Sequence, residues 1–153
     1  TTSRKPGWSP DGLLLCCVAG QTKDKKMEAI HIFHRSDLTK KVTTIGLPQS
    51  SHAKVARFCP LKLKLSEDTN DIDKGSIVDK YKMKYRMLFA IICSSELFIF
   101  DTSKTEAIFY WKDADTQNFL DMEWSFDGKS LLISDIEGFI TRVRINDNDL
   151  VRA

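Results

Sequence analysis

The chain has few of the features that mark membrane, secreted or metal-binding proteins. No apolar run exceeds seven residues, the length of "MLFAIIC" at 87–93, whereas a helix that spans a bilayer needs about 20. The first residues show no signal-peptide core, and no Asn-x-Ser/Thr glycosylation site occurs. We therefore expect neither a membrane-spanning helix nor a secreted protein.

Potential metal ligands are also scarce. The cysteines lie in predicted strands and form no Cys-x-x-Cys pair: Cys16, Cys17, Cys59 and Cys93. His31 and His34, at a spacing of three in a predicted strand, would face opposite sides of a sheet. The acidic stretch "SEDTNDIDKGS" at 66–76 does not place its Asp, Asn and Gly residues as a calcium loop requires. We expect free thiols in a reducing compartment, the cytoplasm or nucleus, and no metal or cofactor.

Enzyme motifs are missing as well. The chain has no Gly-x-Ser-x-Gly elbow, no phosphate-binding Walker loop and no dinucleotide glycine fingerprint. Its 23 basic and 21 acidic residues nearly balance, so the total charge demands neither nucleic acid nor a membrane as partner. We predict that the protein is not an enzyme.

What the sequence does contain is a repeated phrase. "WSPDGLLLCC" at 8–17 and "WSFDGKSLLISD" at 124–135 share Trp-Ser-x-Asp-Gly followed by an apolar run. Asp can bond to its own backbone two residues on, and Gly takes a positive φ without penalty, so the phrase predicts a tight turn between two strands.

A degenerate copy, "VARFCPLKLKL" at 55–65, places Phe58 in the Trp position. Trp8, Phe58 and Trp124 lie 50 and 66 residues apart, and removing a polar insertion of 19 residues at 66–84 shortens the second interval to 47. Such periods are typical of four-stranded propeller blades.

Short apolar segments between the turns supply the other strands, and no long helical period occurs. The sequence predicts an all-β chain of about three four-stranded blades at 3–47, 53–112 (with the insertion 66–84) and 119–153. Residues 119–125, 130–135 and 139–145 should be adjacent antiparallel strands, with Trp124 buried. Because open rows of blades leave unpaired edges, we expect a piece of a larger, seven-bladed ring.

Two places are candidates for partner binding. In "KYKMKYR", Lys80, Lys82, Lys84 and Arg86 alternate with apolar residues, and on an extended chain they would share one face. That face is either a basic ridge for an acidic partner or the wet side of a strand protected against edge pairing.

Trp111 in "FYWK" fits the outermost strand of its blade, where it would anchor a partner or pack on the next blade. Residues 66–79, by contrast, should be weakly ordered, since they offer few apolar groups to offset the entropy of fixing them.

The turns and the ending "FIFDT" at 98–102 resemble WD-repeat propellers. More narrowly, the chain resembles the family of middle-sized WD-repeat subunits of chromatin assembly factor one. The resemblance covers most of residues 3–146, in the stretches "SRKPGWSPDGLLLCCVAG", "IHIFHRSDLTKKVTTIGLP", "AKVARFCPLKLKL", "YRMLFAIICSSELFIFDT" and "LDMEWSFDGKSLLISDIEGF". Two departures are Glu137 before Gly138, where the family pattern predicts Asp, and the lost Asp-Gly turn of the second blade. The sister family of histone-regulator propellers shares much of the pattern.

The resemblance implies a nuclear, non-catalytic scaffold subunit of a histone chaperone that deposits core histones on newly replicated DNA. Its implied partners are the large and small subunits of a chromatin assembly complex, core histones, and a second histone chaperone bound through a tail beyond the propeller. A general WD-repeat adaptor, such as a substrate-presenting subunit of a ubiquitin ligase, is the alternative, and an enzyme on a propeller scaffold is a third.

Overall fold

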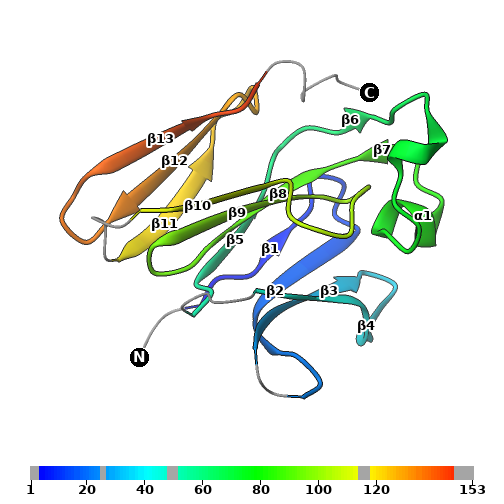
Figure 1. The fold of residues 1–153 in the computed structure, drawn as a ribbon, viewed down its shortest axis with the longest axis horizontal. Coiled ribbons are helices and arrows are strands. Elements are labelled where there is room, and N and C mark those ends of the chain that lie inside the picture. Colours follow the sequence, from blue (N-terminus) through cyan, green and yellow to red (C-terminus); the bar gives the residue numbers. More distant parts are fainter. Residues whose placement is uncertain (1–3, 25–26, 48–51, 114–117, 147–153) are drawn as a thin grey trace.

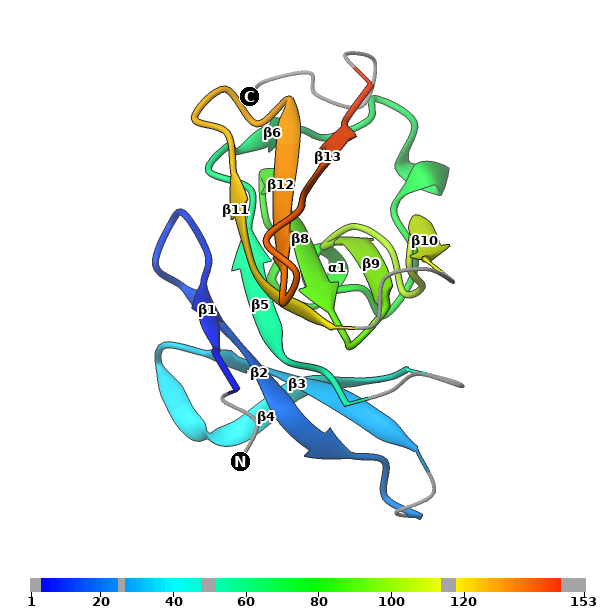
Figure 2. The same cartoon turned by 90° about the vertical axis from the view of Figure 1, so that its left-hand side faces the viewer.

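The computed structural model describes residues 4–24, 27–47, 52–113 and 118–146, and within them three antiparallel sheets follow one another along the chain (Figures 1 and 2). A short two-stranded ribbon, one 3₁₀ turn and one helix of five residues complete the described part. No helix among these residues has the length and apolarity needed to cross a bilayer.

The first sheet contains four strands in chain order: β1 (Gly7–Trp8), β2 (Leu14–Gln21), β3 (Glu28–His34) and β4 (Asp37–Gly46). The second has the order β10-β9-β8-β5, with β5 (Val55–Phe58), β8 (Leu88–Ile92), β9 (Glu96–Asp101) and β10 (Phe109–Lys112). Both sheets are therefore meanders in which β4 and β10 are edge strands.

The third sheet contains β11 (Phe119–Trp124), β12 (Ser130–Asp135) and β13 (Ile140–Arg144) in chain order, with all neighbours antiparallel. This confirms the arrangement predicted for 119–145, with ends that differ by one residue. Trp124 is 5% exposed, as expected of a residue that ends an inner strand.

The first strands of the three sheets lie side by side, and the outer strands spread apart from them (Figure 2). The main chain before β1 bonds to β5, from Lys5 N to Lys54 O at 2.8 Å and from Ala56 N to Lys5 O at 2.9 Å. Lys5 also reaches the third sheet, where its ammonium lies 2.6 Å from a carboxylate oxygen of Asp121. Hydrophobic side chains pack between the diverging sheets.

The middle sheet is buried on both faces, which explains why "LFAII" and the central "LFIF" of "ELFIFD" read as continuous apolar runs. Alternate residues face opposite sides. One core, between the first two sheets, includes Phe58, Phe89, Ile91, Phe98 and Phe100. The other, toward the third sheet, includes Leu88, Ala90, Ile92, Leu97 and Ile99.

The two copies of the repeated phrase fold into the same set of hydrogen bonds. In the first, Leu13 N donates to Asp11 Oδ1 at 2.9 Å and Leu14 N to Ser9 Oγ at 2.9 Å. In the second, Lys129 N donates to Asp127 Oδ1 at 3.0 Å and Ser130 N to Ser125 Oγ at 2.9 Å. Each turn closes on a glycine of positive φ, +70° and +72°. The Ser-x-Asp-Gly chemistry read from the sequence thus determines the turn.

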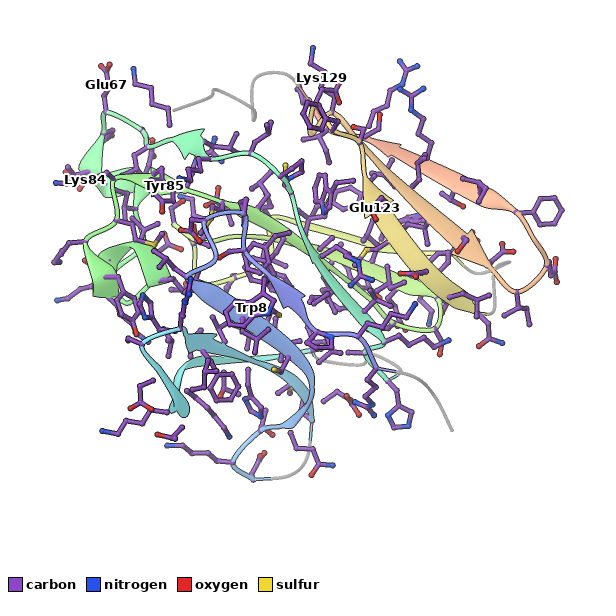
Figure 3. All side chains as sticks on the ribbon, turned by 180° about the vertical axis from the view of Figure 1, so that it is seen from behind. Trp8, Glu67, Lys84, Tyr85, Glu123 and Lys129 are labelled. Carbon is purple, nitrogen blue, oxygen red and sulfur yellow. The ribbon has the colours of Figure 1, made fainter. Side chains whose placement is uncertain are left out.

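In the second and third sheets, the residue at the Trp position of the repeated phrase faces the preceding sheet. Trp124 packs on the second sheet, where its indole N–H donates to Arg57 O at 3.0 Å, and Phe58 packs in the core shared with the first sheet. Trp8 occupies the same place in the first sheet and is 50% exposed, since the described residues include no sheet on that side (Figure 3).

The expectation that the insertion is weakly ordered is wrong. The insertion at 66–84 forms a 3₁₀ turn η1 (Thr69–Asp71) and α1 (Ile77–Tyr81), and the paired strands β6 (Leu63–Lys64) and β7 (Tyr85–Arg86) flank it. Ser76 caps α1 by accepting from Asp79 N at 3.2 Å, and Val78 N donates to Thr102 O at 3.0 Å. Two buried side chains, Ile77 and Val78, anchor the segment to the sheets.

The strand assignment of two cysteines also needs correction. Cys16 and Cys17 lie in β2 and point to opposite faces, one buried and one half-buried, as predicted. Cys59 and Cys93 are buried but lie one residue beyond β5 and β8, at the points where these strands end. None of the four cysteines forms a disulfide bond.

Candidate partner-binding surfaces

The predicted basic ridge at 80–86 is not an extended strand. Lys80 lies in α1, and Lys82 ends that helix with φ +50°, so the chain turns where the alternation required it to be straight. The interpretation of four cations on one strand face is therefore wrong. The physical reason is the Ser76 cap upstream, which starts a helix that the pattern of alternating residues did not reveal.

The four cations instead have separate environments. The Lys80 ammonium donates to Val42 O at 3.0 Å, and that of Lys82 lies 3.1 Å from Asp79 Oδ1. Lys84 is exposed at the edge of the molecule (Figure 3). Arg86 lies 2.8 Å from Asp101 Oδ2, and both side chains are largely buried, at 16% and 7% exposure. Arg86 therefore serves the fold, whereas Lys80 faces the edge of the first sheet.

Trp111 lies in the edge strand β10, as the sequence predicted. It is half-buried, and its ring centroid is 6.0 Å from that of Phe119 in the third sheet. Of the two interpretations, the structure shows packing on the next sheet. That the exposed part of the indole also meets a partner stays a prediction.

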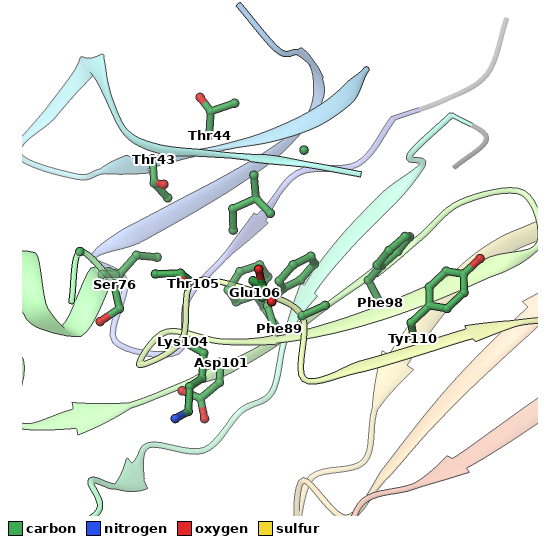
Figure 4. Close-up of a pocket in the computed structure, with 16 residues that line it drawn as sticks. Thr43, Thr44, Ser76, Phe89, Phe98, Asp101, Lys104, Thr105, Glu106 and Tyr110 are labelled. Atoms are coloured by element: carbon green, nitrogen blue, oxygen red, sulfur yellow. The ribbon is translucent and has the colours of Figure 1, made fainter. Parts of the chain in front are cut away.

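A groove of about 820 Å³ opens between the outer strands of the first and second sheets (Figure 4). Its floor is apolar and aromatic, with Phe89, Phe98, Phe100, Ile77 and Tyr110. Phe98 stacks on Phe100 at 6.1 Å and lies 4.9 Å from the Tyr110 ring. Such a concave apolar floor with a polar rim is the usual form of a binding groove. We call it the aromatic groove.

The polar groups near this groove hold loops in place. Asp101 accepts from Ser103 N at 2.8 Å and from Arg86, while Asp73 accepts from Thr105 N at 2.9 Å. The bond from Thr105, with smaller effects of Lys104, lowers the pKa of the Asp73 carboxyl although desolvation opposes it. The Asp101 and Asp73 carboxylates therefore hold the loop at 101–105 in place, and Asp73 links it to the insertion.

The histidines in the first sheet are separate from one another. His31 Nδ1 lies 2.9 Å from Thr44 Oγ1, whereas His34 stacks on Tyr81 at 4.6 Å between centroids. Within the part of the chain that the structure describes, no three His, Cys, Asp or Glu side chains come together in a way that could hold a metal ion. Burial raises the pKa of the Cys16 thiol far above its ordinary value.

Sequence reasoning missed the groove and the contacts of the insertion with the first sheet. These features join residues far apart in the chain, such as Lys80 and Val42, and no local pattern encodes them. The one available signal was the pair of helix-start residues, Ser76 followed by Asp79 three positions later, which is typical of a capped N-terminus.

Comparison with known proteins finds two groups of relatives by sequence. No protein-family model matches the chain. A chromatin assembly factor 1 subunit FAS2 homolog of Oryza sativa is 31% identical over 150 residues, covering 96% of this chain and 28% of that protein. A chromatin assembly factor 1 subunit of Schizosaccharomyces pombe is 27% identical, covering 96% and 29%. The chain thus spans less than a third of these relatives' lengths.

A second group of relatives is named HIR1. That of Kluyveromyces lactis is 28% identical over 162 residues, covering 100% of this chain and 18% of its own length. Among solved structures, the WD40 domain of Toxoplasma gondii coronin superposes with a TM-score of 0.52 at 17% identity, covering 97% of this chain and 33% of the domain's chain. This likeness shows the fold.

Sheets of successive antiparallel strands, the duplicated Ser-x-Asp-Gly turns and the superposition agree with the propeller predicted from the sequence. The chain has the fold of part of a WD40 propeller, and it is similar over 96% of its length to proteins named as chromatin assembly factor 1 subunits, with HIR1 proteins as a second group of relatives.

Proposed function

We propose that the chain is part of a non-catalytic scaffold subunit of a nuclear histone-chaperone complex that deposits core histones onto newly replicated DNA. The observation that carries the proposal is the similarity over 96% of the chain to proteins named for chromatin assembly. On this proposal, its partners are the large and small subunits of a chromatin assembly complex, and core histones. A second histone chaperone would bind through a tail of the subunit.

The architecture supports a scaffold role on physical grounds. Two hydrophobic cores join the three sheets, so the outer loops and grooves have fixed positions relative to one another. The carboxylates at the aromatic groove bind neighbouring loops, which makes that surface rigid. Rigid concave surfaces bind partners with a smaller loss of conformational entropy than flexible ones.

An affinity purification of the full chain from nuclear extract, followed by mass spectrometry, tests the proposal. Recovery of core histones together with a large, charge-rich subunit is the expected result. Recovery of cullin-type ubiquitin-ligase components without histones would overturn it and favour a general adaptor. A chain carrying Trp124→Ala, which disrupts the packing of the third sheet, is the control for binding that requires the fold.

A further inference from the structure

Two connected hollows follow the outer strand β4 of the first sheet, apart from the aromatic groove. One has a volume of about 930 Å³ and the other about 460 Å³, and they share Lys41, Val42 and Lys80. The larger also shares Thr43 and Thr44 with the aromatic groove, so concave surface continues along the strand. We call the two hollows together the β4 cleft.

Positive charge gathers in the β4 cleft. Five cations line it against two carboxylates: Arg4, Lys23, Lys40, Lys41 and Lys80 against Glu28 and Asp37. Because the whole chain has 23 basic and 21 acidic residues, this excess is local.

The two carboxylates are occupied by neighbours on their own sheet. Glu28 lies 3.4 Å from Arg4 and 2.7 Å from His52, and Asp37 accepts from Thr39 N at 2.9 Å. The charge of Arg4 is thereby offset. Among the described residues, four lysines then face one remaining carboxylate, Asp37, so the β4 cleft is positively charged.

Protection of an edge strand against aggregation explains only part of this arrangement. Lysines on the strand itself, Lys40 and Lys41, suffice for that purpose. Lys23, however, follows β2, and Lys80 comes from α1 in the insertion of the second sheet. Three separate segments therefore contribute lysines to the lining of the β4 cleft.

The backbone of β4 adds a feature that suits a polypeptide. As an edge strand, β4 has N–H and C=O groups on its free side. Its pairing with β3 is regular over Thr43–Gly46 and shifts register twice between Thr43 and Asp37, so the regular edge is the shorter part of the strand. At the first of these shifts the Val42 carbonyl, which has no partner on β3, accepts from the Lys80 ammonium at 3.0 Å. An extended peptide can use such groups by strand addition, whereas a phosphate backbone offers acceptors alone.

We propose that the β4 cleft binds an extended acidic segment of a partner protein, which lies along β4 with carboxylates toward Lys23, Lys40, Lys41 and Lys80. Lys40 and Lys41 are consecutive, and both line the smaller hollow because β4 is irregular at this point. This deepens the proposed function, on which it rests for the expectation that the chain meets partner proteins.

A direct titration with the purified full chain tests the proposal without histones or other subunits, so its outcome is independent of the test of the proposed function. The probe is a fluorescein-labelled peptide of about eight residues that alternates glutamate with valine, and anisotropy reports binding. The same peptide with lysine in place of glutamate is the matched probe. We expect saturable binding of the acidic peptide, weakened by added salt, and none of the basic peptide.

The variant Lys40→Glu/Lys41→Glu/Lys80→Glu should weaken binding at least about tenfold and reduce its salt dependence. Lys74→Glu/Lys84→Glu/Lys112→Glu changes the net charge equally at exposed positions outside the β4 cleft and should bind as the unmodified chain does. Since Lys80 also contacts Val42, the milder Lys40→Gln/Lys41→Gln pair is included, and it should weaken binding by a smaller factor.

Three results would overturn the proposal. The first is absence of saturable binding to the acidic peptide by the unmodified chain. The second is equal loss of affinity in the two triple variants, which would show that net charge alone matters. The third is tighter binding of single-stranded DNA than of the peptide, lost in the variants of the β4 cleft, which would assign the cleft to nucleic acid.

Discussion

The hydroxyl of Tyr85 donates a hydrogen bond to the carboxylate of Asp11, 74 positions away in the chain. Asp11 is the aspartate of the first Ser-x-Asp-Gly turn, and its other oxygen accepts from Leu13 N at 2.9 Å. Tyr85 follows the insertion directly, in β7. One carboxylate thus shapes the turn of the first sheet and binds the strand that follows the insertion.

Removing this hydroxyl should destabilise the fold. Tyr85→Phe leaves the Asp11 carboxylate without one donor, and a hydrogen bond to a charged group at a partly exposed site contributes about 1–2 kcal/mol. Urea denaturation measures the difference. Tyr110→Phe removes a hydroxyl from an exposed side chain and should change the free energy of unfolding by less than about 0.5 kcal/mol. Equal effects of the two substitutions would contradict this account.

The same contact predicts a loss of stability in alkali. Burial and the bond to Asp11 raise the pKa of Tyr85 to about 12, above its ordinary value of 10.0. The raised pKa in the folded state means that this stabilisation is complete below pH 10 and declines as the pH rises toward 12. The difference in unfolding free energy between the unmodified chain and Tyr85→Phe should therefore be constant near neutral pH and shrink in that range. A constant difference up to pH 12 would refute the assignment.

The two turn glycines should differ in their tolerance of alanine. Both have positive φ, so either substitution costs about 1 kcal/mol in backbone strain. A Cβ at Gly12 meets only Arg35 at 3.8 Å, whereas one at Gly128 would lie 2.6 Å from Leu61 and 2.9 Å from Cys59. Gly128→Ala should therefore destabilise by about 1–3 kcal/mol more than Gly12→Ala in urea denaturation. The prediction is wrong if the two variants have the same midpoint.

The insertion should contribute to stability through its buried anchor. Ile77 is 4% exposed in the core between the first two sheets, and truncation of such a side chain costs about 2–4 kcal/mol. Ile136→Ala, at a position 58% exposed, is the matched control and should cost less than about 0.5 kcal/mol. Thermal unfolding of both variants measures the contrast. A negligible effect of Ile77→Ala would restore the expectation of a loosely attached loop.

Alanine substitutions of Arg86 and Lys84 should differ in their effect on stability, because Arg86 forms a buried ion pair and Lys84 is exposed. Arg86→Ala leaves the nearly buried Asp101 carboxylate without its cation, which we expect to destabilise by about 3 kcal/mol. Lys84→Ala removes an exposed ammonium and should change stability by less than about 0.5 kcal/mol. Denaturant titration of the two variants checks this. Similar midpoints would mean that the ion pair with Asp101 contributes little.

Local sequence patterns predicted many of the turns and strands of this fold. The Ser-x-Asp-Gly turns bond within themselves, so each copy folds alike wherever it stands. The continuous apolar runs of β8 and β9 predicted strands, because a sheet buried on both faces needs no polar side. The position of Trp111 on an edge strand followed from strand order alone.

Tertiary structure decided what those patterns left open. Trp8 and Trp124 stand in the same phrase, yet one is 50% exposed and the other 5%, since only the second has a sheet to face among the described residues. The alternation at 80–86 suggested a strand, but the Ser76 cap, the burial of Ile77 and the bond from Lys80 to Val42 favour a helix packed on another sheet. Local sequence determines turns and strands because their hydrogen bonds are local. The aromatic groove and the β4 cleft depend on side chains from distant segments, which come together only when the sheets pack.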